Sequence, residues 1–297
     1  MKLGSIEAGG TKFVCAVGTE DGDILERMTI PTETPEETIP KVIQFFKQNP
    51  VGAIGIGSFG PISVKKTDAN YGNILNTPKL AWANFPFLKT IEEALQIPIE
   101  FTTDVNAAAL GEYTFGAGQG LSSCLYITIG TGIGAGAIFG GEILEGISHP
   151  EMGHVIIRRH PEDNFEGVCP YHRDCLEGMA SGPAIEKRWG KKGIELAERK
   201  EVWELEAYYI AQAIVQYTMI LMPERIIIGG GVSNQTHIFT LIQKQVKELL
   251  NIYLSQSQFH EGISEYIVPP GLGNHAGIVG GLVLAKKGLE ESYSCSG

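Results

Sequence analysis

Two cysteines and two histidines near the middle of the chain have the residue types and spacing of a metal site. Cys169, His172 and Cys175 follow one another at three-residue intervals in VCPYHRDCLEG, and His154 precedes them by fifteen residues. Two thiolates and two imidazoles suit tetrahedral zinc, and four protein ligands leave no coordination position open for a substrate. The alternative is two ordinary cysteines beside surface histidines, although four such groups so close together are uncommon in a reducing compartment. We therefore expect a structural zinc ion.

Two glutamates flank this set of cysteines and histidines in the sequence. Glu151 stands three residues before His154, and Glu177 stands two residues after Cys175. A zinc ion there would hold the segments that bear both carboxylates, and a fixed orientation of functional groups contributes strongly to reaction rates. Most glutamates are solvated surface groups, which is the alternative for both. Two further histidines remain open as reserve metal ligands, His149 and His160.

Three glycine turns follow apolar, strand-like stretches: EAGGTK at 7–12, IGTGIGAG at 129–136 and IIIGGGVSNQ at 226–235. Glycine permits backbone conformations in which several amide N–H groups point at one anion. In the first turn, Thr11 adds a hydroxyl donor and Lys12 a positive charge, although the spacing is not that of a P-loop. Each turn alone is also compatible with the bend of a hairpin. Three together fit a nucleotide, whose phosphates need two binding loops and whose purine needs a slot.

Asp104 stands where an apolar, strand-like stretch changes into an alanine-rich, helix-like stretch in TTDVNAAAL. A carboxylate at this point can face a cleft and act as a general base. An aspartate before a helix is also a common N-cap, and one residue could serve both purposes.

The elements that would position these residues alternate between strands and helices, which predicts the α/β class. Strands are expected within 3–24, 51–62, 97–103, 122–144 and 224–229, and helices within 34–49, 104–113, 206–222 and 274–288. The strand–turn–strand stretches around Gly9 and Gly132 are similar, which suggests two lobes of related design.

Composition excludes several classes of protein. The chain has 297 residues and a net charge of −11, which disfavours binding to nucleic acid. No apolar run approaches the roughly 20 residues of a membrane span. The five cysteines form an odd set that does not indicate a disulfide framework, so we expect a cytoplasmic protein.

The order of these motifs resembles that of the ROK family of sugar kinases and repressors over nearly the whole chain. The segments that carry the resemblance are IEAGGTK, GIGSFGP, TTDVNAAALGE, ITIGTGIGAG, PEMGH, CLEGMASGPAI and IIIGGGVS. The chain is most similar to bacterial ROK fructokinases, which share EAGGTKF and TPKLAW. It departs from the usual family pattern at two positions, because Glu7 stands where Asp is more common and His172 replaces one of three cysteines.

The resemblance implies the actin-like ATPase (ribonuclease H-like) fold, an α/β fold with two lobes and a cleft between them. An N-terminal lobe would span residues 1–115 and be completed by a C-terminal helix at about 276–297. A C-terminal lobe with the zinc-binding loop would span residues 116–275. Nucleotide and sugar would bind in the cleft, and the family suggests a homodimer.

The implied activity is ATP-dependent phosphorylation of a hexose, D-fructose to fructose 6-phosphate, with Asp104 as the general base. Mg²⁺ would bridge the phosphate oxygens and be held largely by water. The phosphates would lie on the first two glycine turns, at Gly9, Gly10, Thr11, Lys12, Thr131 and Gly132. The adenine would lie between Pro183 and the third turn, at Gly230, Gly231, Val232, Ser233, Asn234 and Gln235. The sugar would contact Gly60, Asp104, Glu151 and Glu177, and Asn76 and Thr77 are further candidates that a surface loop explains equally well.

Three other functions are alternatives to a fructokinase. The same chemistry on glucose, mannose or an amino sugar fits the family equally well. A sugar-sensing binding protein without catalysis is disfavoured because Asp104, Lys12 and Thr131 are all present. A zinc-dependent nucleic-acid binder is excluded by charge, because the zinc segment lacks the basic clustering that phosphate contacts require. The expected partners are therefore a hexose and a second copy of the chain, with neither nucleic acid nor membrane.

Overall fold

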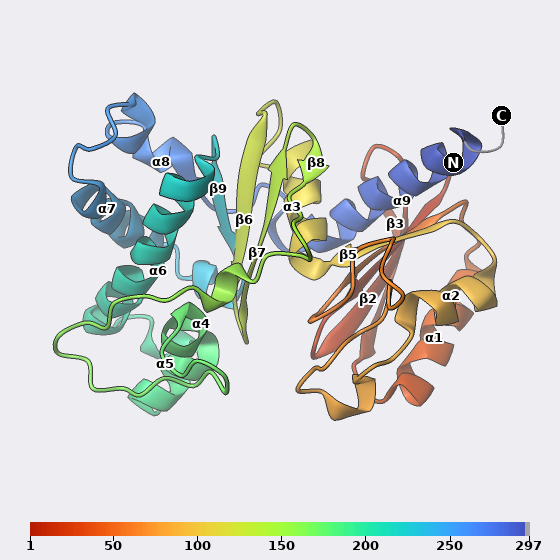
Figure 1. The fold of residues 1–297 in the computed structure, drawn as a ribbon, viewed down its shortest axis with the longest axis horizontal. Coiled ribbons are helices and arrows are strands. Elements are labelled where there is room, and N and C mark those ends of the chain that lie inside the picture. The colour runs from red at the N-terminus through yellow and green to blue at the C-terminus, as the bar shows by residue number, and fades with distance from the viewer. Residues whose placement is uncertain (295–297) are drawn as a thin grey trace.

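Two five-stranded sheets, one in each half of the molecule, organise the structure (Figure 1). The computed structural model describes residues 1–294, so Cys295 and the last part of the helix expected at 276–297 lie outside the described residues. The first sheet has the strand order β3-β2-β1-β4-β5, and the second has the order β10-β9-β6-β7-β8. Each combines an antiparallel hairpin with parallel strands, in agreement with the two similar strand–turn–strand stretches of the sequence.

The strands that carry the first and second glycine turns are almost entirely buried. The first sheet comprises β1 Leu3–Ala8, β2 Lys12–Gly18, β3 Ile24–Pro31, β4 Ile54–Ser58 and β5 Ile99–Thr103. The second comprises β6 Ser123–Ile129, β7 Ile133–Phe139, β8 Glu142–Ile143, β9 Ile226–Gly229 and β10 Ile267–Val268. The second glycine turn is shorter than the run of glycines at 129–136 suggests, because Gly134 and Gly136 belong to β7 and pair with β6.

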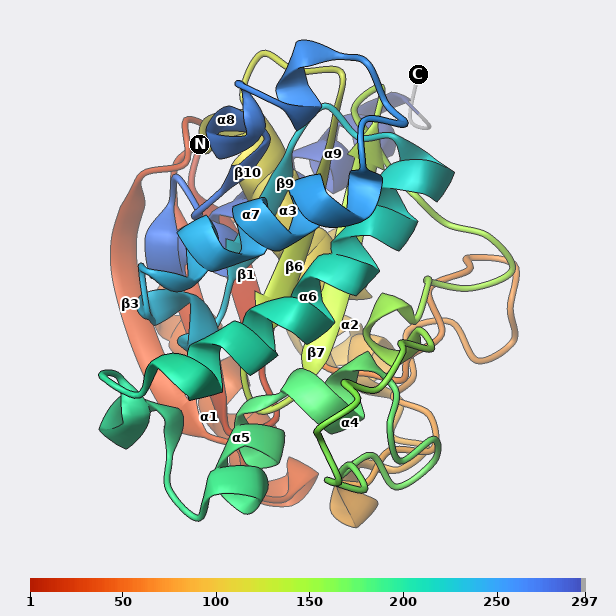
Figure 2. The ribbon, with the colours of Figure 1, turned by 90° about the vertical axis from the view of Figure 1, so that its left-hand side faces the viewer.

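Helices cover both sheets and fill the space between them. They are α1 Pro35–Gln48, α2 Phe87–Leu95, α3 Asp104–Phe115, α4 Leu176–Ala180, α5 Gly182–Trp189, α6 Lys200–Leu221, α7 Ile238–Leu250, α8 Ile263–Tyr266 and α9 Ala276–Ser294. Short 3₁₀ turns occur at Leu80–Trp82 (η1), Met152–His154 (η2), Gly193–Leu196 (η3), Gly231–Asn234 (η4), Ser257–Phe259 (η5) and Gly273–His275 (η6). Helices α6 and α7 pack on each other and lie across the outer side of the second sheet (Figure 2).

Local sequence explains where the helices begin. Thr34 and Glu37 form a capping box at the start of α1, and Pro35 occupies its first turn, where no backbone donor is needed. Helix α3 begins after Thr103, whose hydroxyl accepts from the backbone N–H of Asn106 at 3.1 Å. Thr103, not Asp104, is therefore the N-cap, and the carboxylate of Asp104 is not needed for that purpose.

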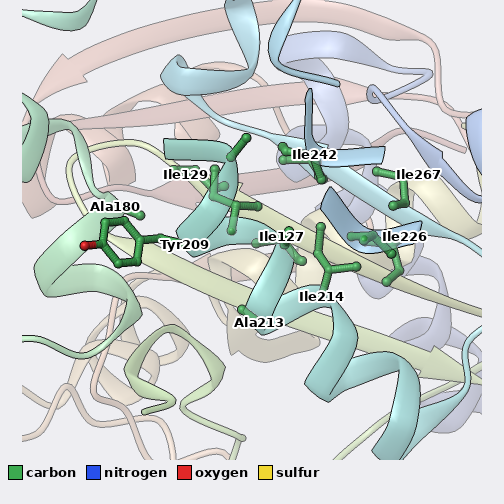
Figure 3. Close-up of a cluster of buried hydrophobic side chains, with 14 of the residues drawn as sticks. Ile127, Ile129, Ala180, Tyr209, Ala213, Ile214, Ile226, Ile242 and Ile267 are labelled. Carbon is green, nitrogen blue, oxygen red and sulfur yellow. The ribbon is translucent and has the colours of Figure 1, made fainter. Parts of the chain in front are cut away.

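Each sheet has its own hydrophobic core. In the first, the ring of Phe13 lies 5.2 Å from that of Trp82 and 5.7 Å from that of Phe87, between centroids. In the second, isoleucines of β6 and β9 pack against α6 and α7, with Ile127, Ile226 and Ile214 fully or almost fully buried (Figure 3). Both cores are continuous, so each sheet is a rigid support for the loops at its strand ends.

Helices α3 and α9 cross between the two sheets at unusually short range (Figure 1). A Cβ added to Gly280 would lie 1.6 Å from the carbonyl oxygen of Ala107, and one added to Gly111 would lie 2.4 Å from that of Ala276. Glycine is thus required for the two backbones to touch. Helix α9 also packs on β1 and β4, although it is separated from them by most of the sequence.

Candidate functional site

A cleft of about 410 Å³ opens where the ends of β1, β6 and β9 meet the first turns of α3 and α9. Ligands of α/β proteins commonly bind at such strand ends. Its lining residues come from both halves of the chain: Glu7, Asp104, Val105, Ala108, Tyr126, Thr128, Gly230, Ser233, Asn234, Thr236, Pro269, Pro270, Gly273, Asn274, Ala276 and Gly277. Two carboxylates, Glu7 and Asp104, thus face one space with the third glycine turn.

Asp104 occupies the first residue of α3, directly after β5, and remains partly exposed to the cleft. The pKa of Asp104 is raised to about 7, chiefly by burial, with the charge of Glu7 acting in the same direction. The backbone N–H of Val105, which donates to Oδ1 at 2.9 Å, lowers this pKa in part. A carboxyl group that ionises near neutral pH is well matched to removing a proton from a substrate hydroxyl.

Glu7 is the penultimate residue of β1 and lies beside the first turn of α9. Burial raises its pKa, against the opposing charges of Lys12 and Arg27. A Cβ on Gly277 would lie only 2.9 Å from the Glu7 carboxyl carbon, so the helix leaves this carboxylate just enough room. Carboxylate oxygens and water are the ligands that Mg²⁺ prefers, and Glu7 fits the binding of a magnesium-bound water.

The first glycine turn joins β1 to β2, where the backbone N–H of Gly9 donates to the carbonyl oxygen of Lys12 at 3.0 Å. The side chain of Lys79 lies against this turn. Its Cε atom is 3.2 Å from the position that a Cβ on Gly10 would take. The sequence alone did not single out Lys79. Within TPKLAW it has the features of any surface lysine, and only the fold brings it beside the turn.

The second and third glycine turns lie next to each other. The backbone N–H of Gly182 donates to the carbonyl oxygen of Gly130 at 2.7 Å, which brings the start of α5 and its Pro183 to the second turn. Gly230 has φ +86°, and a Cβ there would lie 2.5 Å from the carbonyl oxygen of Ile129. Of the nucleotide-binding candidates, Gly230, Ser233 and Asn234 line the cleft. The other candidates lie outside its lining: Gly9, Gly10, Thr11, Lys12, Thr131, Gly132, Pro183, Gly231, Val232 and Gln235.

The four predicted zinc ligands come together within the described part of the chain. One donor atom from each of His154, Cys169, His172 and Cys175 lies within 4.8 Å of all the others. Nδ1 of His154 is 3.5 Å from Sγ of Cys175 and 3.7 Å from Sγ of Cys169, and Nδ1 of His172 is 3.8 Å from Sγ of Cys169. Ordinary Zn–S and Zn–N bond lengths in a tetrahedron place N and S about 3.6 Å apart. The donor chemistry and spacing fit zinc.

The two reserve histidines lie outside this cluster. The ring of His160 packs edge-on against Tyr208, and His149 faces the loop after β4 through the backbone N–H of Ile62. Neither is needed to complete four ligands.

Glu177 links the four-residue cluster to the second glycine turn. Its Oε1 lies 4.0 Å from Nε2 of His154, and its Oε2 accepts from the backbone N–H of Ile133 at 3.0 Å. A Cβ on Gly132 would lie 2.8 Å from the same Oε2. A carboxylate beside the free nitrogen of a metal-binding histidine fixes that ring and itself.

Of the remaining sugar-site candidates, Gly60, Asn76 and Thr77 lie on two loops of the first half, whereas Glu151 directly precedes η2 in the second half. Gly60 precedes a cis bond to Pro61, whose carbonyl oxygen accepts from the backbone N–H of Leu75 at 2.8 Å. This hydrogen bond pairs the Gly60 loop with the segment bearing Asn76 and Thr77. Thr77 is buried whereas Asn76 is exposed. Glu151 is also mostly exposed, with 58% of its side chain accessible.

Sequence comparison identifies the family to which this arrangement belongs. The model of the ROK family matches residues 3–288. The chain belongs to the ROK family. One relative, a protein from Bacillus subtilis (strain 168), is 60% identical to this chain. The match covers 97% of this chain and 96% of the relative. A fructokinase from Pediococcus pentosaceus is 47% identical, covering 98% of this chain and 100% of its own.

Solved structures of ROK proteins have the same fold. A ROK hexokinase from Thermus thermophilus superposes with a TM-score of 0.79 at 25% identity, covering 98% of this chain and 100% of that one. A ROK family glucokinase from Streptomyces griseus, solved with glucose and AMPPNP, gives 0.75 at 26% identity, covering 97% and 100%. The predicted two-lobed actin-like fold is confirmed. Within residues 1–294, none of the helices has the length and hydropathy that crossing a bilayer requires.

Proposed function

We propose that this ROK protein transfers the terminal phosphoryl group of ATP to D-fructose, giving fructose 6-phosphate and ADP. The observation that carries the proposal is the partly exposed carboxylate of Asp104 at the cleft, with its pKa raised to about 7. The sugar is chosen from the relatives, because a protein 47% identical over nearly its whole length is a fructokinase.

Asp104 acts as the general base in this proposal. Its carboxylate accepts the proton of the C6 hydroxyl while that oxygen bonds to the γ-phosphorus and the bond to the leaving ADP breaks. Positioned bases of this kind contribute about 10²- to 10⁴-fold to the rate. The neighbouring Glu7 raises the pKa of Asp104 and so strengthens it as a base.

The glycine turns bind the nucleotide. Backbone N–H groups of the first and second turns face the phosphates, and Lys12 and Lys79 supply positive charge to a protein whose net charge is −11. The third turn, with Ser233 and Asn234 in the cleft wall, contacts the adenosine part. Mg²⁺, bound mainly through phosphate oxygens and water, would neutralise phosphate charge, and Glu7 fits the binding of one such water.

The cysteine and histidine cluster holds a structural zinc ion in this proposal. Its purpose is to fix His154 and, through Nε2 of that ring, the carboxylate of Glu177. Glu177 and Glu151 then accept hydrogen bonds from sugar hydroxyls, and the Gly60 loop contacts the same sugar. Cys₂His₂ coordination requires reduced cysteines, which fits the expected cytoplasmic location.

The proposal also covers the division of the chain and its assembly. We place the lobe boundary near residues 115 and 116, after α3, with α9 assigned to the N-terminal lobe because it packs on β1 and β4. Closure of the lobes over the sugar would exclude water that competes for the phosphoryl group. A homodimer follows from family resemblance alone.

A panel of hexoses tests the choice of sugar. Purified protein with Mg-ATP is offered fructose, glucose, mannose and N-acetylmannosamine, and ADP release is followed by a coupled assay. We expect the highest kcat/KM with fructose. A higher value with another hexose would overturn the choice of sugar but not the chemistry, whereas sugar binding without any ADP release would favour the sugar-sensing alternative.

A further inference from the structure

His149 lies between the two lobes at the edge of the proposed sugar site. Only 9% of its side chain is exposed, although Ile147, two residues earlier in the same loop, is fully exposed. Three groups surround its ring. The backbone N–H of Ile62 donates to Nε2 at 3.5 Å, Oε1 of Glu151 lies 3.6 Å from Nδ1, and a Cβ on Gly60 would lie 3.9 Å from Cε1.

These contacts determine where the imidazole carries its proton. Because the N–H of Ile62 points at Nε2, that nitrogen is the acceptor, so the neutral ring carries its hydrogen on Nδ1. Nδ1–H then faces the carboxylate of Glu151, at a distance slightly longer than a full hydrogen bond. A chain of donors thus runs from the Ile62 amide through His149 to Glu151.

The two ends of this chain belong to different lobes. Ile62 is part of the hydrophobic core of the first sheet, whereas Glu151 immediately precedes η2, which ends in the zinc-ligand candidate His154. A second contact joins the same two segments, since Nζ of Lys65 lies 3.2 Å from Oε2 of Glu145. The spacing between Ile62 and Glu151 therefore depends on how far the lobes are closed.

We infer that His149 is a positioning residue for the sugar, holding the exposed Glu151 carboxylate in its binding orientation when the lobes close. The inference depends on the proposed function, because it assigns a sugar contact to Glu151. Sugar binding draws the lobes together and brings the Ile62 amide closer to Nε2 of His149. This fixes the ring, whose Nδ1 faces the Glu151 carboxylate two residues further along the same segment, and so orders Glu151. The contacts of the His149 ring are with Ile62, Glu151 and Gly60, not with the glycine turns that bind phosphate. Loss of the ring should therefore weaken the binding of the sugar and not that of the nucleotide.

Kinetics of His149→Ala test this inference. A hydrogen bond to a charged group contributes enough to change binding by about tenfold or more. We expect the KM for fructose to rise at least tenfold, while the KM for ATP, the affinity for ADP and Tm stay near wild-type values. Lys65→Met is the matched control, because it removes the neighbouring contact between the lobes but not the ring, and its KM for fructose should change little.

Two conservative variants separate the two halves of the ring. In His149→Asn the amide nitrogen takes the place of Nδ1 and keeps a donor for Glu151, whereas in His149→Gln the amide group takes the place of Nε2. We expect Asn to restore most of the sugar affinity and Gln to behave like Ala. Adding Glu151→Gln to His149→Ala should cost little more than either change alone, since both remove one interaction.

The inference is overturned if His149→Ala leaves the KM for fructose within twofold of wild type, if Asn and Gln restore it equally, or if the double variant is additive. The proposed function fails separately, when the wild-type protein itself does not phosphorylate fructose. In that case the same variants are measured by calorimetry on the hexose that binds.

Discussion

At the scale of single residues, the account depends on the ionisation of Asp104. The sequence showed a carboxylate at a strand–helix junction but left an N-cap role open, because the two roles occupy neighbouring positions. The structure assigns the cap to Thr103, and the remaining question is the charge on Asp104. That charge is set by burial and by Glu7, a residue far away in the sequence, so no local pattern could have predicted it.

The pH dependence of kcat/KM for the sugar follows from this pKa. The base acts only when ionised, and burial raises the pKa of Asp104 to about 7 in the free protein. We expect kcat/KM to be level above pH 8 and to fall about tenfold per unit below pH 6, measured with ATP saturating. Protein returned from pH 5.5 to pH 8 should regain full activity, which separates titration from denaturation. A level profile down to pH 5.5 would exclude a base with this pKa.

At the scale of elements, spacing in the sequence was sufficient to predict that His154, Cys169, His172 and Cys175 come together. Cys169, His172 and Cys175 lie in one short loop, so their proximity is a local property. The orientation of Glu177 was not predictable in detail. It depends on the backbone of Ile133 in another strand and on the ring of His154.

Loss of the zinc ion should damage the sugar site before the nucleotide site. Cys169→Ser, or incubation with a chelator, is expected to raise the Kd for fructose about tenfold to a hundredfold, because Glu177 loses its fixed neighbour. The same treatments should change the Kd for ADP by less than about twofold. Metal analysis should find one zinc per chain in the wild type and much less in the variant. Cys124→Ala, a change at a buried cysteine outside the cluster, is the control and should keep both zinc and sugar affinity. Unchanged sugar affinity in zinc-free protein would refute the role given to the metal.

The contact between α3 and α9 makes a second prediction at this scale. Alanine in place of glycine normally stabilises a helix by up to about 1 kcal/mol. At Gly280 the added Cβ would lie 1.6 Å from the carbonyl oxygen of Ala107. Helix α9 would therefore have to move away from α3, the helix that begins with Asp104. We expect Gly280→Ala to lower the free energy of unfolding by about 1–3 kcal/mol or more.

Thermal unfolding of two glycine variants measures this effect. Gly288→Ala is the matched control in the same helix, because its Cβ would meet only side-chain atoms of Glu100, the nearest being Cγ at 2.6 Å, and no backbone atom, so that the side chain can turn aside. A Tm for Gly280→Ala equal to that of Gly288→Ala would show that the helices are not in backbone contact.

At the scale of the whole molecule, the function requires two lobes that share one cleft. The class of fold and the order of the motifs were predictable, since apolar strands ending in glycine turns alternate with helices along the chain. The geometry between the lobes was not. The position of Lys79 beside Gly10, the crossing of α3 and α9, and the contacts of His149 all join residues that are distant in sequence. The sequence left His149 open as a reserve metal ligand, but its ring lies outside the cluster of cysteines and histidines. Its actual neighbours could be identified only from the fold.

One experiment tests the central claim most directly, that Asp104 removes a proton from fructose during transfer from ATP. Wild-type protein and Asp104→Asn are compared for ADP release in the presence of fructose and Mg²⁺, and fructose binding to both is measured by calorimetry. The account predicts a loss of at least a hundredfold in kcat for Asp104→Asn, with fructose bound about as tightly as by the wild type. A variant that turns over fructose within tenfold of the wild-type rate would contradict it.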